Sequence, residues 1–241
     1  MDSRKPKWSE YTKGNPEDIY AKANVTTSQG IAIIDGHFKN DSQISFEADV
    51  EIKEYKLNEL LQNDQLGALS LSIKASGSGN DVNRLDAVLE ANISSFQLNN
   101  YAIKDLVING KLKDGKGDVV SVHKDKILEL DFNADVVLDS VAPRASVHLH
   151  IIGANLQSLG LMQRDVRTAL KFDADFEGDK DGFDVIATVG DGVVVYDDKT
   201  YLLGDVLATG HVRSDTTSVW LDNKIYAYPF VSPLVFSYFK L

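Results

Sequence analysis

Several kinds of residue are absent or scarce in this sequence of 241 residues, and each absence excludes a class of structure. Cysteine is absent, which excludes a disulfide framework and a thiolate metal site. Residues 1–30 contain no apolar run typical of a secretory signal or membrane anchor. No proline lies between Pro16 and Pro143, as expected of a long series of paired strands in which every backbone N–H is needed.

Basic residues are also outnumbered. Lys and Arg total 25 against 36 Asp and Glu, which gives a net charge of -11 and a pI near 4.8. This balance argues against nucleic acid as a partner and against broad adsorption to anionic membrane surfaces. A hydrophobic content of 43% is that of a folded protein, and the length suits one large domain or two ordinary ones.

What the chain does contain is an internal repeat of about one hundred residues. The segment Tyr101–Leu112 returns as Tyr201–Val212, with Tyr, Asp and Gly in the same places. Earlier in the repeat, Leu57 and Leu60 correspond to Leu156 and Leu159. Repeats of this kind stack into elongated architectures in which each unit contacts its neighbours. Because the repeat begins abruptly and is in mid-cycle near residue 222, we expect the chain to be a piece of a longer protein.

From Ile31 onward the apolar residues recur at every second position, which predicts antiparallel β-strands with one dry and one wet face. Four segments share the form large apolar, polar, Ala, acid or amide, large apolar. Such alternation suits a concave sheet whose inner face curls, and equally a closed core. The residues expected to line the dry face are Phe46, Ala48, Val50, Leu71, Ile73, Leu89, Ala91, Ile93, Leu106, Ile108, Leu130, Phe132, Ala134, Val136, Leu149, Ile151, Leu170, Phe172, Ala174, Val206 and Ala208.

Three regions follow from these patterns. Residues 1–30 are expected to be a loose lead-in with a short helix from about Pro16 to Lys22, and residues 31–222 form the repeated β region. Short helices are expected at residues 56–64 and, in the repeat, around residues 156–161, and a flexible turn at residues 76–79. Residues 223–241 contain an aromatic segment, broken by Pro229 and Pro233, that is too short to span a membrane.

The dry faces need partners, because almost no predicted helix is available to cover them. One solution is a sheet folded onto itself as a filled sandwich or solenoid, which would make the protein purely structural. The other is a mainly β half-pipe whose dry concave groove stays open for an apolar guest. A dozen strands would give a trough on the order of 55–60 Å long, suited to acyl chains.

One run of motifs resembles a known family. It comprises Leu57-Asn-Glu-Leu-Leu61, the strand from Gly67 to Gly79, Leu89-Glu-Ala-Asn-Ile-Ser-Ser-Phe96, Asn100-Tyr101 and Ile108-Asn-Gly-Lys-Leu112. In order and spacing these segments are similar to the Bacteroidetes-type branch of the TamB/AsmA-like family, the inner-membrane components of the translocation and assembly module. The resemblance covers roughly residues 31–222, but neither a membrane anchor nor a family-like segment after residue 224 accompanies it.

The resemblance implies an elongated, twisted antiparallel "β-taco" with an apolar groove. It implies a periplasmic protein, anchored in the inner membrane by a helix outside this chain, that cooperates with an outer-membrane barrel of the Omp85 class. The implied roles are transport of phospholipid between the two membranes and support of outer-membrane protein translocation and assembly.

Catalytic and metal-binding patterns are weak by comparison. His148 and His150 alternate with apolar residues, so we expect both on the wet face without a third metal ligand. Asp173, Asp175 and residues 179–181 lack the spacing of a calcium loop. Because no nucleophile elbow or phosphate loop is present either, we expect neither enzymatic activity nor a metal or cofactor.

Three hypotheses for function remain open from the sequence. The chain is a groove segment that binds phospholipid or another acyl-chain ligand, a scaffold that pairs its strand edges with client β-strands, or a filled structural repeat such as an adhesin spacer. Open strand edges also make self-association an expectation.

Overall fold

The computed structural model describes residues 7–99, 101–213 and 216–223. The chain divides into two compact units. Unit 1 comprises residues 1–115 and 159–161, and unit 2 comprises residues 116–158 and 162–241. The aromatic segment expected at residues 225–241 lies outside the described residues.

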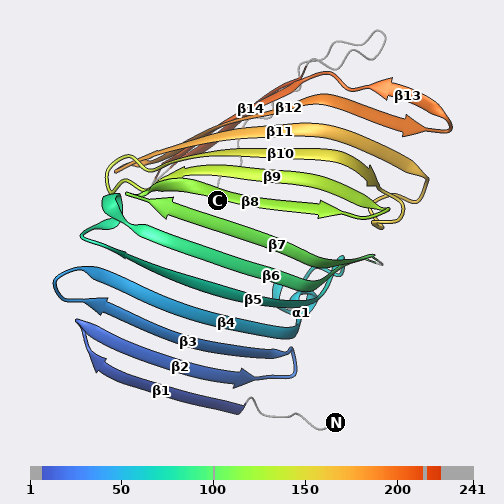
Figure 1. The fold of residues 1–241 in the computed structure, drawn as a ribbon. Coiled ribbons are helices and arrows are strands. Elements are labelled where there is room, and N and C mark those ends of the chain that lie inside the picture. The colour runs from blue at the N-terminus through green and yellow to red at the C-terminus, as the bar shows by residue number, and fades with distance from the viewer. Residues whose placement is uncertain (1–6, 100, 214–215, 224–241) are drawn as a thin grey trace. The chain divides into compact units, whose positions relative to one another are not determined.

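Unit 1 is an antiparallel sheet in which every strand pairs with the next along the chain (Figure 1). Its strands are β1 (Lys7–Asn15), β2 (Asp18–Thr26), β3 (Ile31–Asn40), β4 (Ile44–Lys56), β5 (Leu66–Gly79), β6 (Asp86–Leu98) and β7 (Tyr101–Lys113). The helix α1 (Leu57–Leu61) follows β4, and a single 3-10 turn (Val82–Arg84) precedes β6.

Unit 2 continues the same plan with one exception. Its strands are β8 (Lys116–Lys124), β9 (Leu128–Val137), β10 (Arg144–Asn155), β11 (Val166–Asp179), β12 (Gly182–Tyr196), β13 (Lys199–Leu202), β14 (Val206–Arg213) and β15 (Thr217–Asn223). The short β13 pairs with the end of β12, and β14 pairs with the beginning of β12. The predicted mainly β, antiparallel fold is confirmed, and no helix among the described residues has the length and apolarity needed to cross a membrane.

Strand register gathers the alternating apolar residues on one face of each sheet. In unit 1, Ala48 lies opposite Ala75, and Ile73 lies opposite Ala91, which in turn lies opposite Ile108. Because directly paired residues point to the same side, these positions share a face. All of the predicted lining residues of unit 1 fall on this face, which we call the apolar face.

The same arrangement holds in unit 2. Val147 lies between Ala134 and Ala174, and Ala174 pairs with Ala187, which pairs with Ala208. The predicted lining residues of unit 2 all belong to this apolar face. Ala174, Ala187 and Ala208 therefore form a row of small side chains across three neighbouring strands, and Val147 separates Ala134 from this row.

The predicted helix at about Pro16–Lys22 is wrong, because Asp18–Thr26 is strand β2. The side chain of Asn15 accepts hydrogen bonds from the backbone N–H groups of Glu17 (2.8 Å) and Asp18 (3.1 Å), as a helix cap would. These bonds instead close the hairpin between β1 and β2. The residues that follow decide the outcome, because Ile19, Ala21, Ala23 and Val25 alternate with polar residues at the period of a strand. The expected loose lead-in is correspondingly strand β1 over residues 7–15.

Two further expectations differ from the structure. The helix after β4 forms, but its repeat over residues 156–161 is a turn, in which Asn155 Oδ1 accepts the backbone N–H of Ser158 at 2.8 Å. The flexible turn expected at residues 76–79 is part of β5. A Cβ on Gly77 would lie 2.7 Å from the Phe46 ring, so this glycine allows close packing within the sheet and does not mark a turn.

Candidate functional site

The most distinctive physical feature of the protein is how little of its apolar surface is buried. In the described part of the chain seven apolar residues are buried, whereas 25 large apolar side chains are exposed. Among the described residues no large side chain is completely buried.

The reason is that the sheets have one layer. Within the described part of the chain, extensive contacts join strands that are neighbours in a sheet, and α1 contacts β5. Within the described residues of each unit, no second sheet or helix of that unit covers its apolar face. Side chains such as Ile73, Ile108 and Phe172 are consequently half-buried by their neighbours and open to solvent above.

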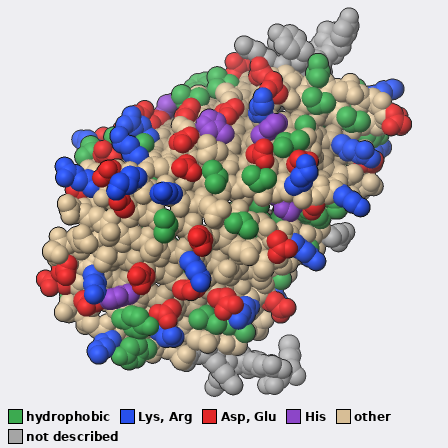
Figure 2. All heavy atoms as spheres, viewed as in Figure 1, with side chains coloured by type: hydrophobic (Ala, Val, Ile, Leu, Met, Phe, Trp, Pro, Cys, Tyr) green, Lys and Arg blue, Asp and Glu red, His purple; other side chains and the backbone are tan. Residues whose placement is uncertain are grey.

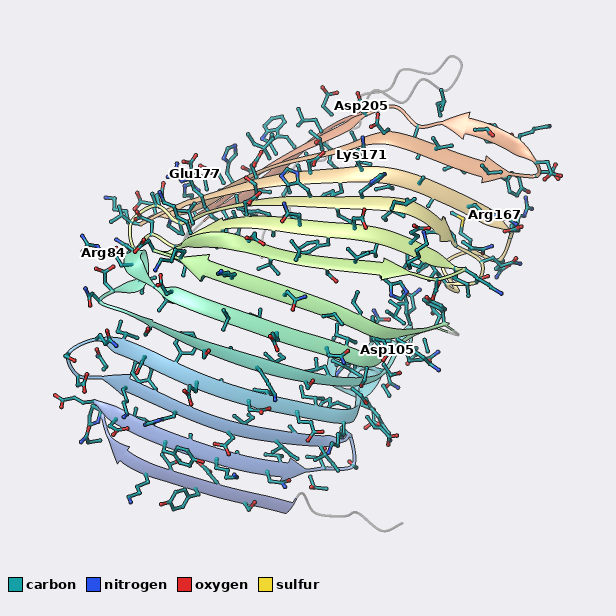
Figure 3. All side chains as sticks on the ribbon, in the orientation of Figure 1. Arg84, Asp105, Arg167, Lys171, Glu177 and Asp205 are labelled. Carbon is teal, nitrogen blue, oxygen red and sulfur yellow. The ribbon has the colours of Figure 1, made fainter. Side chains whose placement is uncertain are left out.

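The opposite faces are charged. Figure 2 shows acidic, basic and histidine side chains scattered over the visible face, and Figure 3 shows side chains standing along the strands, Lys171 among them. The Lys22 ammonium lies 2.7 Å from Asp35, and Lys171 lies 2.8 Å from Asp191. Hydrogen bonds from these lysines lower the pKa of both aspartates. Each unit therefore has one apolar face and one face of ion pairs.

Two hollows of unit 1, of about 850 and 520 Å³, open on the charged face. The first is lined by side chains that include Asp35, Glu47 and Lys74. A twisted sheet is saddle-shaped, so a hollow can form on either face. These two hollows therefore belong to the charged face and not to the apolar face.

An apolar cavity of about 540 Å³ lies in unit 2, and the sequence patterns did not indicate it. It is lined by Met162, Gln163, Arg164, Val166, Val194, Tyr196 and Tyr201. Val166 pairs with Tyr196, and Val194 pairs with both Thr168 and Tyr201. Residues 162–164 precede β11, and the other lining residues come from the beginning of β11, the end of β12 and β13, which strand pairing brings together.

His148 and His150 lie on the polar face where expected. His148 and His150 are exposed, and His148 Nδ1 is 2.6 Å from Asp173 on the neighbouring strand. That hydrogen bond raises the pKa of His148. Asp179 accepts the backbone N–H groups of Asp181 (2.7 Å) and Gly182 (3.0 Å) and so shapes a hairpin. In the described residues no three histidine or acidic side chains gather as a metal site would require.

Comparisons with models of protein families, with curated proteins and with solved structures find no match to this chain.

Proposed function

We propose that the apolar faces of this protein bind the acyl chains of phospholipids and carry them along the sheet. The observation that supports this proposal is the uncovered apolar face of each unit, which the described residues leave without a second layer. Exposed apolar surface on this scale is typical of a binding surface. A ligand composed of hydrocarbon matches it chemically.

Burial supplies the binding energy in this proposal. Each methylene removed from water contributes about 0.8 kcal/mol, so an acyl chain needs no hydrogen bonds to be held. Ala174, Ala187 and Ala208 lie next to one another on three neighbouring strands and form a low strip between larger side chains. Such a strip crosses the strands and can seat a narrow chain without a rigid pocket.

The resemblance to the TamB/AsmA-like family extends the proposal. In this form, the chain is a segment of a periplasmic bridge anchored in the inner membrane, which delivers phospholipid to the outer membrane and supports protein assembly there. Its partner is an Omp85-class barrel. The protein acts by binding and guiding its cargo, without catalysis, metal or cofactor.

Strand pairing is a second candidate, supported by β15, the last strand in the sheet order of the described residues. Val219, Trp220 and Leu221 on this strand are between 51% and 61% exposed, and Asp222 is the one charged residue of Thr217–Asn223. An apolar edge with so little charge is suited to adding a strand from a client protein or from a second copy of this chain.

The experiment that tests lipid binding compares two double variants purified without detergent from a lipid-containing host. Ile73→Asp with Ile108→Asp places two charges on the apolar face of unit 1. Val88→Asp with Val107→Asp places the same charges on the opposite face of neighbouring strands, where both valines are exposed. Circular dichroism verifies that both variants remain β proteins.

Mass spectrometry of organic extracts gives the result. We expect near-stoichiometric phospholipid on the wild type and on the control, and a strong loss on the apolar-face variant. Absence of lipid from all three proteins would refute lipid binding and favour strand pairing. Equal amounts of phospholipid on the wild type and both variants would show that the lipid binds elsewhere on the chain.

A further inference from the structure

The apolar cavity of unit 2 contains one cation among its lining residues, Arg164. Its guanidinium donates a hydrogen bond to the phenol oxygen of Tyr196 and lies 5.7 Å from the centre of that ring. The ring contact stabilises the charge and orients the guanidinium without neutralising it. An arginine held in this way keeps donors for an incoming anion.

The carboxylates near Arg164 in sequence are not part of the cavity lining. Asp165 accepts hydrogen bonds from Asn155 at 3.0 Å and from Arg167 at 3.3 Å. Asp197 and Asp198 follow Tyr196 in the β12–β13 hairpin turn. In the described structure Arg164 contacts the neutral phenol of Tyr196. The chain as a whole has a net charge of -11, so this cation is suited to recognising an anion.

Apart from Gln163, the remaining lining residues are apolar or aromatic. Met162 is 49% exposed and Tyr201 is 48% exposed, while Val166 at the base is buried. The volume of about 540 Å³ is that of a small-molecule site. A ligand that fits must therefore combine hydrocarbon with a negative charge.

The cavity lies on the same side of β11 as the apolar face. On β11, Val166, Thr168, Leu170 and Phe172 alternate on one side of the strand, and Leu170 pairs with Ile151 of β10. A chain that enters at the cavity can thus extend over the apolar residues of β10 and β11.

We propose that Arg164, at the edge of this cavity, forms a headgroup site that binds the phosphate of a phospholipid, while the acyl chains lie in the cavity and on the apolar face of unit 2. This inference rests on the proposed lipid-binding function and names the part of the ligand that is recognised by charge. The site selects phospholipids over uncharged lipids with the same acyl chains.

The test measures binding of two short-chain lipids to the intact chain by isothermal titration calorimetry. Dihexanoyl phosphatidylglycerol carries the phosphate, and dihexanoylglycerol has the same acyl chains without it. We expect the phospholipid to bind about tenfold more tightly, as one hydrogen-bonded charge pair provides. Arg164→Gln should abolish this difference, and Arg164→Lys should restore only part of it.

Arg167→Gln is the matched control, since Arg167 lies three residues away and pairs with Asp165 outside the cavity lining. It should leave the tenfold preference unchanged. Equal affinity for both lipids in wild type and Arg164→Gln would overturn the headgroup site and leave acyl-chain binding intact. Failure of both lipids to bind would refute the proposed function itself. Displacement of the phospholipid by millimolar inorganic phosphate would overturn the lipid assignment in favour of a free-anion site.

Discussion

Tyr101 and Tyr201 occupy the same place in the internal repeat, yet Tyr101 is 7% exposed and Tyr201 is 48% exposed. Tyr101 begins the long strand β7 and pairs with Leu98 of β6. Tyr201 lies on β13, a strand of four residues that pairs with the end of β12. Equivalent residues thus have different surroundings because β7 runs unbroken where its repeat is divided into β13 and β14.

Truncating the two tyrosines should have different effects on stability. Tyr101→Ala is expected to lower the free energy of unfolding by about 3–5 kcal/mol, because a buried aromatic ring is removed. Tyr201→Ala, the control, should change it by less than about 0.5 kcal/mol. Thermal unfolding followed by circular dichroism measures both, with a shift of roughly 6 °C or more expected for the first. Equal shifts would contradict the difference in burial.

Ala174 should not tolerate a larger side chain. It is 3% exposed although it lies in a single-layer sheet, because it is enclosed by its neighbours on β10 and β12. Ala174→Leu is expected to destabilise the protein by about 1–3 kcal/mol through overpacking. Thr188→Leu, on the exposed opposite face, is the control. A chemical denaturation midpoint unchanged by Ala174→Leu would show that the strip at Ala174 is looser than its exposure indicates.

The hairpin between β11 and β12 requires glycine at position 182. Gly182 has a φ of +154°, and a Cβ there would lie 1.9 Å from the carbonyl oxygen of Val212. We expect Gly182→Ala to lower the unfolding free energy by about 1–3 kcal/mol. Gly153→Ala should have a small effect, since a Cβ at Gly153 meets no atom within 4 Å. Differential scanning calorimetry distinguishes the two, and similar melting temperatures would refute the steric argument.

The His148–Asp173 pair should give a pH-dependent contribution to stability. The hydrogen bond from His148 to Asp173 raises the pKa of the folded imidazole above its ordinary value of 6.5. A raised pKa means that the contribution is fully present below about pH 6.5 and is lost as the pH rises through the folded pKa. NMR titration should show His148 titrating above its ordinary value in the wild type and nearer to it in Asp173→Asn. An identical titration in the two proteins would contradict the pairing.

Much of the fold is predictable from local pattern. The alternation at Phe46, Ala48 and Val50 is sufficient to place these residues on one face, because successive side chains on a strand point to opposite sides. The same rule, applied to Ile19, Ala21 and Ala23, would have avoided the incorrect helix near Pro16. A capping residue such as Asn15 can close a turn before a helix or before a strand. The spacing of the apolar residues after the turn determines whether a helix or a strand follows.

The candidate site was only partly predictable. The apolar faces follow from periodicity, but the cavity at Arg164 depends on residues 162–164, 166, 194, 196 and 201, which no sequence period connects. A β-bulge, marked by Asp191 at a φ of +51°, shifts the register between β11 and β12 and sets Val194 and Tyr196 on the apolar side. Sequence alternation alone cannot show such a shift, because one extra residue reverses the face of every residue after it.

The sequence by itself determined that this is an antiparallel β protein with one dry and one wet face, since side-chain direction along a strand is a local property. The tertiary structure decided that, among the described residues, no second layer of the same unit covers the dry face of that unit. It also decided that Arg164 lies beside the apolar cavity of unit 2. Those outcomes depend on which strands lie side by side and in what register, and register is set by contacts between residues far apart in the chain.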